Sequence, residues 1–432
     1  MKEIELWMLA PFAMMLSGIA FLPLLLPRMW EKNIVKIIFA NILALPTISL
    51  LANIGYGSEI KHQMLFDYLP FIILIGALYI VTGGINIKLS FAPTPRNNTA
   101  ILFIGYLLAS IMGTTGAALL LVRPLLSMNK KRVHKAHLML FLIALVANCG
   151  GLLTPLGDPP LFMLFLRGVP FGWFLTLFPV WATIGAILLA LYYLADTYYY
   201  RKEEKVNVAT EANSVTCRGA QNFIYLVAIV LAVAFINTEH IPLMQENGAP
   251  LYIMFLREIV LIIIALLSWF TTSSTTRKEN SYSWSSFNEI AILFFGIFVT
   301  MTPALIYLRS HASEIGIASE SGFYYATGLL SSFLDNTPTA ITLYTLAMES
   351  NVSGAGVMVA GIPESYLAAI SLGAVLFGSM TYIGNGPNFM IKSIAEEDGV
   401  KMPGFFGYIL QFALLVLLPL FIIIQLLFVN FS

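Results

Sequence analysis

Two short stretches of this sequence place polar and helix-breaking residues inside long apolar runs. The first is TPLGDPPLFM (154–163), in which Asp158 lies between a glycine and two prolines. The second is SSFLDNTPTAI (331–341), in which Asp335 precedes Asn-Thr-Pro. Carboxylate, amide and hydroxyl oxygens suit a small hard cation, and a carboxyl group in a low-dielectric cavity can also bind a proton. These stretches therefore predict a site for sodium ions or protons.

The neutral ligands of this site are expected in the same stretches and in two related ones. The acids are Asp158 and Asp335, and the neutral candidates are Thr114, Thr115, Asn148, Thr154, Asn336, Thr337, Thr381, Asn385 and Asn388. Capping of the helix that follows is an alternative role for each acid. Breaks in the backbone are predicted at Gly157, Pro159, Pro160, Gly384, Gly386 and Pro387. A helix broken inside a bilayer leaves unpaired N–H and C=O groups, so we expect these groups to line an enclosed cavity.

The composition indicates a polytopic membrane protein in contact with the lipid bilayer. Of the 432 residues, 58% are hydrophobic and 11% are charged, and the formal net charge is zero. This balance gives no reason to expect nucleic-acid binding. The two cysteines, Cys149 and Cys217, lie in an apolar and a polar setting, so a disulfide framework is not expected. No nucleophile and base pair of a known enzyme pattern lies inside the apolar runs, so we expect neither an enzyme nor a cofactor.

Helix breakers divide the apolar part of the chain into a series of expected helical segments. They are 5–27, 34–53, 67–87, 100–122, 137–165, 171–199, 221–237, 250–270, 287–308, 323–347, 364–392 and 404–430. A polar stretch at 201–220 is predicted to be a cytoplasmic linker. It separates the chain into residues 1–200 and 221–432.

The two parts of the chain resemble each other. TPLGDPPLFM (154–163) aligns with TYIGNGPNFM (381–390), and SIMGTTGAA (110–118) aligns with SFLDNTPTA (332–340). The other apolar segments follow the same order in both parts. The sequence thus predicts a unit of six elements that is used twice.

One element of each unit is predicted not to cross the membrane. The segments at about 100–122 and 323–347 have small, polar and helix-breaking residues at their centres, which favours re-entrant hairpins. The segments at about 137–165 and 364–392 are predicted to be broken helices. Each unit then makes five crossings, so the second unit enters the bilayer upside down. We therefore expect an all-α polytopic membrane protein with an inverted-topology repeat.

The positions of the basic residues support this topology. If the hairpins do not cross, most of the 23 Lys and Arg residues fall on one side, and the exceptions are Lys2, Lys61, Arg167, Arg257 and Arg309. By the positive-inside rule this side is cytoplasmic, so both termini are expected outside a cell (inner) membrane. Arg257 and Glu258 are adjacent in an apolar segment and are not expected to face each other. A scaffold or subunit-contact role is favoured for them over transport.

The motifs resemble those of the ion transporter superfamily. ANCGGLLTPLGDPPLFM (147–163) is similar to the glycine-rich segment of NhaD-type sodium/proton antiporters, and SSFLDNTPTAI (331–341) is similar to their Asp-Asn/Thr hairpin. Citrate and dicarboxylate transporters of the superfamily are similar as well. The resemblance implies that Asp158 and Asp335 bind the cation and the proton, with Asn336, Thr337 and Asn385 as neutral ligands. It also implies a homodimer with a scaffold domain and a moving transport domain.

These observations lead to one main functional prediction and several alternatives. The main prediction is a secondary transporter that exchanges sodium, and also lithium, for protons by alternating access, with sodium as transported substrate. The first alternative is sodium- or proton-coupled transport of citrate or a dicarboxylate, whose carboxylates would bind to hairpin amides and helix N-termini. An intramembrane enzyme and a channel are further alternatives. The enzyme is disfavoured because the apolar runs contain no nucleophile and base arrangement, and the interrupted repeat favours a transporter over a channel.

Overall fold

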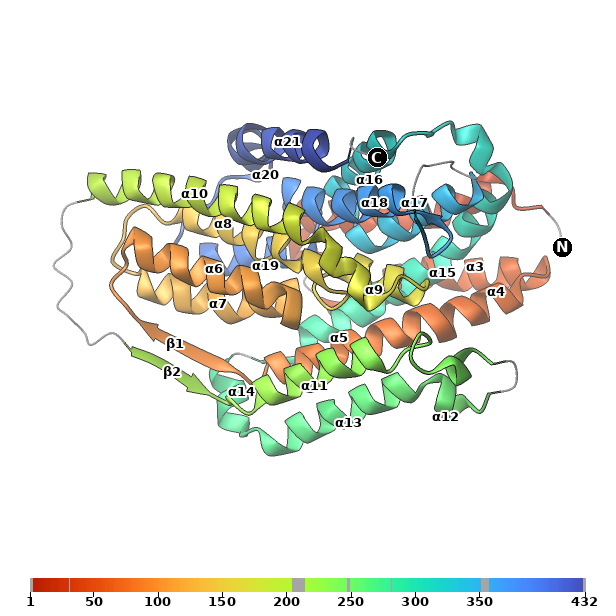
Figure 1. Cartoon of the computed structure of the whole chain (residues 1–432), viewed down its shortest axis with the longest axis horizontal. Helices are drawn as coiled ribbons and strands as arrows, with labels where there is room; N and C mark the ends of the chain where they lie inside the picture. Colours follow the sequence, from red (N-terminus) through yellow and green to blue (C-terminus); the bar gives the residue numbers. More distant parts are fainter. Residues whose placement is uncertain are drawn as a thin grey trace.

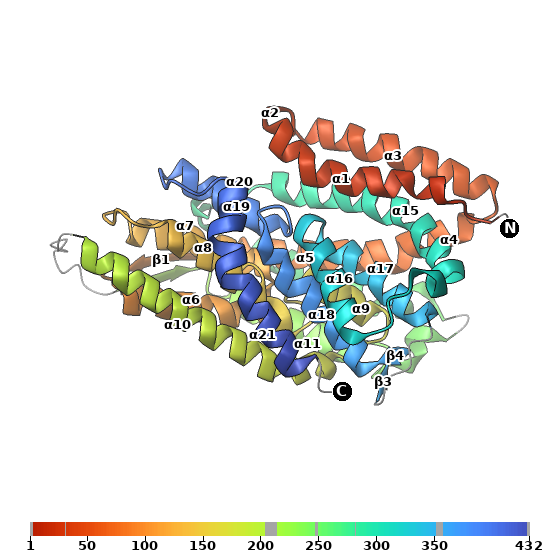
Figure 2. The same ribbon diagram turned by 90° about the horizontal axis from the view of Figure 1, so that it is seen from above.

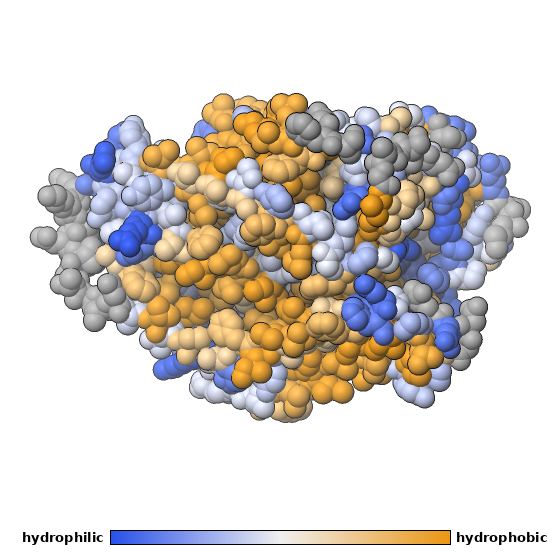
Figure 3. Space-filling model, in the orientation of Figure 1, coloured by the Kyte–Doolittle hydropathy of each residue, from blue (hydrophilic) through white to orange (hydrophobic). Residues whose placement is uncertain are grey.

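The computed structural model describes residues 3–30, 32–203, 214–246, 249–280, 282–350 and 357–429. Most of this part of the chain is helical (Figure 1). Seven described helices are long and apolar enough to cross a membrane, namely Leu6–Pro23, Asn33–Asn53, Gly57–Thr82, Ala136–Leu153, Phe171–Lys202, Phe287–Ala312 and Phe405–Phe428. Apolar residues gather over the middle of the surface and hydrophilic residues lie toward its two ends (Figure 3). The protein is therefore a multi-pass membrane protein, as the composition predicts.

The first part of the chain contains most of the expected segments at the expected positions. Its helices are η1 (Leu6–Leu9), α1 (Ala10–Leu25), α2 (Pro27–Trp30), α3 (Asn33–Asn53), α4 (Gly57–His62), the π-helix η2 (Gln63–Tyr68), α5 (Leu69–Thr82), α6 (Pro95–Met112), α7 (Thr114–Met128), α8 (Ala136–Leu145), η3 (Cys149–Leu153), α9 (Pro159–Leu166), η4 (Phe171–Leu177) and α10 (Phe178–Lys202).

The second part has a corresponding series. Its helices are α11 (Asn222–Phe235), η5 (Pro242–Gln245), α12 (Leu251–Met254), α13 (Leu256–Thr271), α14 (Ser274–Glu279), α15 (Trp284–Ile315), α16 (Glu320–Phe333), α17 (Asn336–Glu349), α18 (Glu364–Phe377), η6 (Gly378–Met380), α19 (Gly386–Glu397), α20 (Phe405–Tyr408), the π-helix η7 (Ile409–Leu417) and α21 (Leu418–Phe428). Each expected segment of this part overlaps at least one of these helices.

The stretch predicted to be a linker contains a strand that the sequence analysis did not anticipate. Residues 204–213 of this stretch lie outside the described residues. Ser214–Arg218 form β2, which pairs antiparallel with β1 (Asn86–Ser90), so that Ile87 lies opposite Cys217. The side chains of β2 are exposed, so no alternation of apolar and polar residues marks it in the sequence. A short second ribbon joins β3 (Met358–Val359) and β4 (Ile362–Pro363).

The helices form two groups, each built from both parts of the chain. In one group α1 and α3 pack against α15, and α5 packs against α11 and α13 (Figures 1 and 2). In the other group α6, α7, α8 and α10 lie beside α19 and α21, and α16, α17 and α18 pack together. One continuous apolar core joins the two groups, because α15 also packs against α17.

Candidate functional site

Two interrupted helices bring the candidate residues to the interior of the molecule. In the first, the chain leaves η3, becomes extended at Thr154 and starts α9 after Asp158. In the second, it leaves η6, becomes extended at Thr381 and starts α19 after Asn385. The backbone angles of the two breaks agree closely: φ and ψ are −142° and 140° at Asp158 and −145° and 140° at Asn385. The sequence similarity between the two stretches therefore corresponds to the same local conformation.

The hydroxyl groups of the two matched threonines hold the breaks in shape. Thr154 donates to the backbone oxygen of Ser110, and Thr381 donates to the backbone oxygen of Ser332. Each threonine oxygen also accepts a hydrogen bond from a backbone N–H two positions later, at 3.2 Å in both breaks. These contacts satisfy backbone groups that the interruption releases. Both hydroxyls are thus directed at backbone groups of the neighbouring hairpin-like helix pairs.

Glycine is required at the first break because two backbone segments cross there. A Cβ atom on Gly157 would lie 1.9 Å from the backbone oxygen of Gly151. At the matched position, a Cβ on Gly384 would lie 2.6 Å from the backbone oxygen of Gly378. No side chain fits at either distance, so the close approach depends on glycine.

Asp158 lies at the centre of the site, where only neutral donors contact its carboxylate. Its Oδ1 accepts from Thr114 Oγ1 at 2.9 Å and lies 3.4 Å from Asn385 Nδ2, and its Oδ2 accepts from Asn336 Nδ2 at 3.0 Å. The side chain is fully buried. Burial of a carboxylate without a basic partner is costly, and these hydrogen bonds offset only part of that cost.

Four helix N-termini converge on this carboxylate. Asp158 precedes the first residue of α9, Thr114 and Asn336 are the first residues of α7 and α17, and Asn385 precedes the first residue of α19. The N-terminal end of a helix has a partial positive charge. This arrangement favours negative charge at the site although no lysine or arginine contacts Asp158 among the described hydrogen bonds.

Asp335 lies beside this centre in a different environment. It is the N-cap of α17, and its Oδ1 accepts from the backbone N–H of Thr337 at 2.9 Å. The alternative role of helix capping is therefore confirmed for Asp335. Its side chain is only half-buried, however, and it also lines a cavity. The hydroxyl of Thr337 is buried and has no hydrogen-bond partner in the described part of the chain. The pair of residues presents oxygen atoms that remain available to a cation.

Asparagine side chains connect the two breaks. Asn148 Nδ2 donates to Asn388 Oδ1 at 2.8 Å, and Asn385 Nδ2 lies 3.2 Å from Asn148 Oδ1. Asn388 in turn donates to the backbone oxygens of Gly378 and Thr381 at 2.8 and 2.9 Å. The structure thus brings the polar residues from both parts of the chain into one buried network.

A cavity of ≈ 450 Å³ reaches the site from one side. Its inner end is lined by Thr115, Asp335 and Asn385, together with Pro159, Gly386 and Pro387 from the breaks. Its walls are mostly apolar side chains of α5, α7, α15 and α19, and its outer end includes Arg123 and Glu397. Because α5 and α15 belong to one helix group and α7 and α19 to the other, the cavity lies between the two groups.

A second cavity of ≈ 430 Å³ is lined by residues beyond the other end of α9. There Arg167 Nη2 contacts Asp67 Oδ2 at 2.7 Å, and Arg257 Nε contacts Glu258 Oε1 at 2.8 Å. The expectation that Arg257 and Glu258 do not face each other is therefore wrong. Both lie in the first turn of α13, where their long side chains turn toward each other, and the guanidinium also lies over the Phe165 ring.

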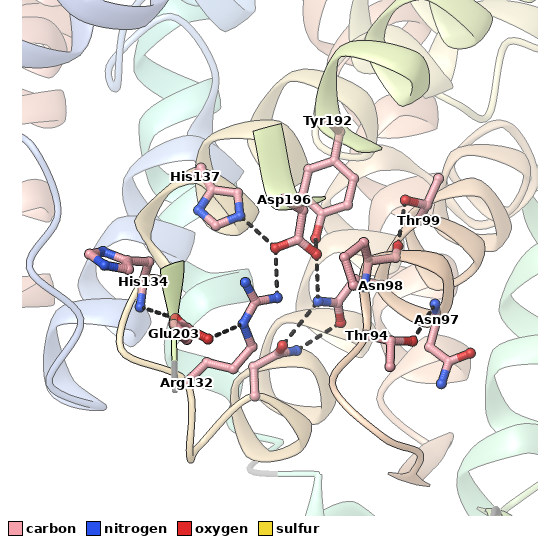
Figure 4. A network of polar contacts seen from close by, with 12 residues as sticks. Thr94, Asn97, Asn98, Thr99, Arg132, His134, His137, Tyr192, Asp196 and Glu203 are labelled. Carbon is pink, nitrogen blue, oxygen red and sulfur yellow. Dashed lines mark hydrogen bonds and ion pairs between the residues drawn. The ribbon is translucent and has the colours of Figure 1, made fainter. Parts of the chain in front are cut away.

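A buried ionic network at the base of the α6–α7 pair was not anticipated from the sequence (Figure 4). Asp196 Oδ1 contacts Arg132 Nη1 at 2.6 Å and His137 Nε2 at 2.8 Å, and its Oδ2 accepts from Asn98 and Tyr192. Asp196 and Arg132 are almost completely buried. The network joins the start of α6, the start of α8 and the end of α10, so its role is to fix these elements relative to one another.

Several oxygen atoms at the site could hold a cation. The carboxylates of Asp158 and Asp335, the hydroxyl of Thr337 and the amide oxygens of Asn336 and Asn385 are the available groups, since amide orientation is interchangeable between O and N. In the described part of the chain no cluster of three His, Cys, Asp or Glu residues has metal-ligand geometry. Carboxylate, amide and hydroxyl oxygens are the ligands that hard cations prefer, and a carboxyl group can also hold a proton.

Sequence reasoning missed the charged residues at the outer end of the cavity. Arg123 follows Thr115 and Leu119 at intervals of four residues, so the three share one face of α7. That spacing could have indicated that Arg123 lies on the same helix face as Thr115. The sequence does not indicate that α5 and α15 lie opposite this face, because they come from distant parts of the chain.

Comparison with known families gives one match and one negative result. A family model described as "Putative citrate transport" matches residues 1–429. No curated protein matches the chain.

Proposed function

Because the chain belongs to this citrate transport family, a family of transporters and not of enzymes, we propose that it is a secondary transporter of a citrate-like carboxylate, coupled to sodium ions or protons. The observation that favours this function is the convergence of four helix N-termini beside the cavity, whose partial positive charges favour an anion. Only α7 has no proline in its first turn, so the N–H groups of Thr115 and Gly116 are the ones that can bind a carboxylate without a basic side chain. The family thus supports the alternative of the sequence analysis better than its main prediction.

In this proposal the acids bind the coupling ion. Asp158 and Asp335 would be charged when they hold sodium, or neutral when they hold protons, and either state removes their repulsion of a substrate carboxylate. Asn336, Thr337 and Asn385 would complete the cation ligands. The apolar walls of the cavity would exclude water around the bound substrate and so strengthen these interactions.

Sodium/proton exchange is a second candidate for the same site. It is favoured by the complete enclosure of Asp158 among neutral donors, because such a carboxyl group can exchange a proton for a cation without any organic substrate. In that case Asp335, on the cavity wall, would be the first of the two site acids to meet an entering ion.

We further propose the arrangement in the membrane that the sequence predicts. The helix pairs α6–α7 and α16–α17 would be re-entrant hairpins, and the two parts of the chain would form an inverted repeat with both termini outside the cell (inner) membrane. The group that contains α5 and α15 would act as scaffold in a homodimer, and the group that contains the breaks would move. A cavity between two such groups is what alternating access requires.

Transport in proteoliposomes distinguishes the two candidates. For symport, uptake of radiolabelled citrate is measured with inward gradients of sodium or protons, each compared with potassium. For exchange, the lumen is made acidic and its pH is followed after external sodium, lithium or potassium is added. Gradient-dependent citrate uptake supports the carboxylate transporter. Alkalinisation by sodium or lithium in the absence of citrate, with no citrate uptake, would replace it by the antiporter. Liposomes without protein and with Asp158→Asn serve as controls.

A further inference from the structure

Arg123 is the one basic residue among the described residues that line the cavity leading to the site. It lies on α7, is exposed, and takes part in none of the described ion pairs. An arginine without a carboxylate partner at the entrance of a cavity is free to bind an incoming anion.

The position of Arg123 on α7 directs it along the cavity. Thr115, at the inner end, and Leu119 share its helix face, and eight residues of α-helix separate Thr115 from Arg123 by about 12 Å. Side chains on a helix lean toward its N-terminus, so the long side chain of Arg123 can extend back toward Thr115 and the site. In that orientation the distance from the guanidinium to the first turn of α7 is shorter than the distance between the two backbone positions.

The charges along the cavity are arranged in sequence. Asp335 lies at the inner end, and Glu397, at the end of α19, lies at the outer end with Arg123. Helix N-termini give the inner end only partial positive charge. A substrate with a single carboxylate needs no more than this, whereas a second carboxylate needs a full positive charge within reach.

From this arrangement we infer that Arg123 is a specificity-determining residue that binds the outer carboxylate of a di- or tricarboxylate while another carboxylate occupies the helix N-termini near Thr115. The inference rests on the proposed carboxylate transport. It predicts that Arg123 affects the affinity for the substrate and not the translocation step. Arg123 lies about two helical turns from the N-terminal end of α7, the end that is near Asp158 and Asp335. Glu397 opposes it electrostatically.

The test is the concentration dependence of citrate transport in proteoliposomes, with citrate presented on the face of the membrane to which the Arg123 cavity opens. In the proposed topology this is the cytoplasmic face, so the KM values below refer to citrate on that face. Arg123→Gln is expected to raise KM roughly tenfold, with the maximal rate within about twofold of the wild type, and the effect should shrink at high ionic strength. Arg123→Lys should restore most of the affinity, because it keeps the charge. Glu397→Gln should lower KM. Arg96→Gln, an exposed basic residue at the start of α6 that does not line the cavity, is the matched control.

Each alternative result overturns the inference. An unchanged KM in Arg123→Gln would remove Arg123 from substrate binding while leaving the proposed function intact. Equal losses in the Gln and Lys variants, with a reduced maximal rate, would indicate a structural role instead. An equal rise of KM in Arg96→Gln would indicate that both arginines act only through the overall positive potential of the surface, and not through a contact between Arg123 and the substrate. Absence of gradient-driven citrate uptake by the wild type would overturn both this inference and the proposed carboxylate transport.

Discussion

Asn336 Nδ2 donates a hydrogen bond to Asp158 Oδ2 at 3.0 Å, although the two residues are 178 positions apart in the chain. Asn336 opens α17 and Asp158 precedes α9, and these two helices pack against each other. The contact places the Asp-Asn-Thr stretch of one part of the chain against the Gly-Asp-Pro stretch of the other. In the proposed mechanism, binding of a proton or a cation at Asp158 would thereby act on the helix that Asp335 caps.

The first prediction concerns the two acids. Asp158→Asn and Asp335→Asn are each expected to abolish ion-coupled transport, because an amide can neither bind a proton near neutral pH nor neutralise the charge of a cation. Both variants should stay folded, since an amide oxygen can still accept from Asn336 or from the backbone of Thr337. Coupled uptake and thermal stability in detergent are measured together, with the exposed Asp398→Asn as the matched control. Wild-type coupling in either variant would remove that acid from the mechanism.

The sequence allowed much of the helical architecture to be predicted, for a physical reason. A bilayer requires apolar runs about as long as its core, so the predicted span 34–53 matches α3 closely, and 287–308 lies within the longer α15. Breaks inside apolar runs are equally conspicuous, since Gly157 and Pro159 interrupt the backbone hydrogen bonding. The repeated stretches also identified matched backbone conformations at Asp158 and Asn385.

Contacts between distant elements could not be predicted in the same way. Asp196 is four residues from Tyr192 on an aromatic helix end, and its partners Arg132 and His137 come from another loop and helix. Nothing in the local pattern indicates that these groups are buried together. Strand β2 was missed for a related reason, because its pairing with β1 depends on a partner more than a hundred residues earlier.

The second prediction tests the close approach of backbone at the first break. Gly157→Ala is expected to destabilise the fold by roughly 3 kcal/mol or more, because its Cβ cannot fit beside the backbone oxygen of Gly151. Gly172→Ala, where a Cβ meets nothing within 4 Å, should change stability by less than about 0.5 kcal/mol. Thermal unfolding in detergent compares the two alanine variants. Equal stability of both would show that the backbone relaxes freely at Gly157.

The third prediction concerns the buried network around Asp196. Arg132→Met removes the guanidinium that contacts both Asp196 and Glu203, and leaves a buried carboxylate without its charged partner. The expected loss is about 3–5 kcal/mol of unfolding free energy. Arg309→Met breaks the more exposed contact with Glu59 and should cost about 0–1 kcal/mol.

Two further observations complete this test. The double variant Arg132→Met with Asp196→Asn should recover part of the stability, because only Glu203 then remains as a buried carboxylate without its cationic partner. If Arg132→Met and Arg309→Met reduced stability equally, the network would not fix the helix ends. Transport rates measured in parallel separate a loss of folded protein from a loss of function.

The last prediction concerns the pH dependence of the β1–β2 ribbon. Hydrogen bonding from Lys88, together with the charges of Arg218 and Lys88, holds the pKa of Glu279 below its ordinary value of 4.5. Lys88 Nζ lies 3.2 Å from Glu279 Oε2, and Asn86 Nδ2 donates to the same oxygen at 2.9 Å. A carboxyl group whose pKa is lowered in the folded state stabilises that state above its unfolded pKa. This contribution is lost as the pH falls from about 4.5 through the lower folded value.

The ribbon should therefore be firmly attached to α14 at neutral pH and loosen in acid. Spin labels at Cys217 and on α14 would report this as a broadened distance distribution below about pH 4.5. Glu279→Gln should show the broad distribution at neutral pH and little further change in acid, because it cannot lose a charge. A wild-type distribution that stays narrow through this range, or a variant that loosens only in acid, would show that another group controls the ribbon.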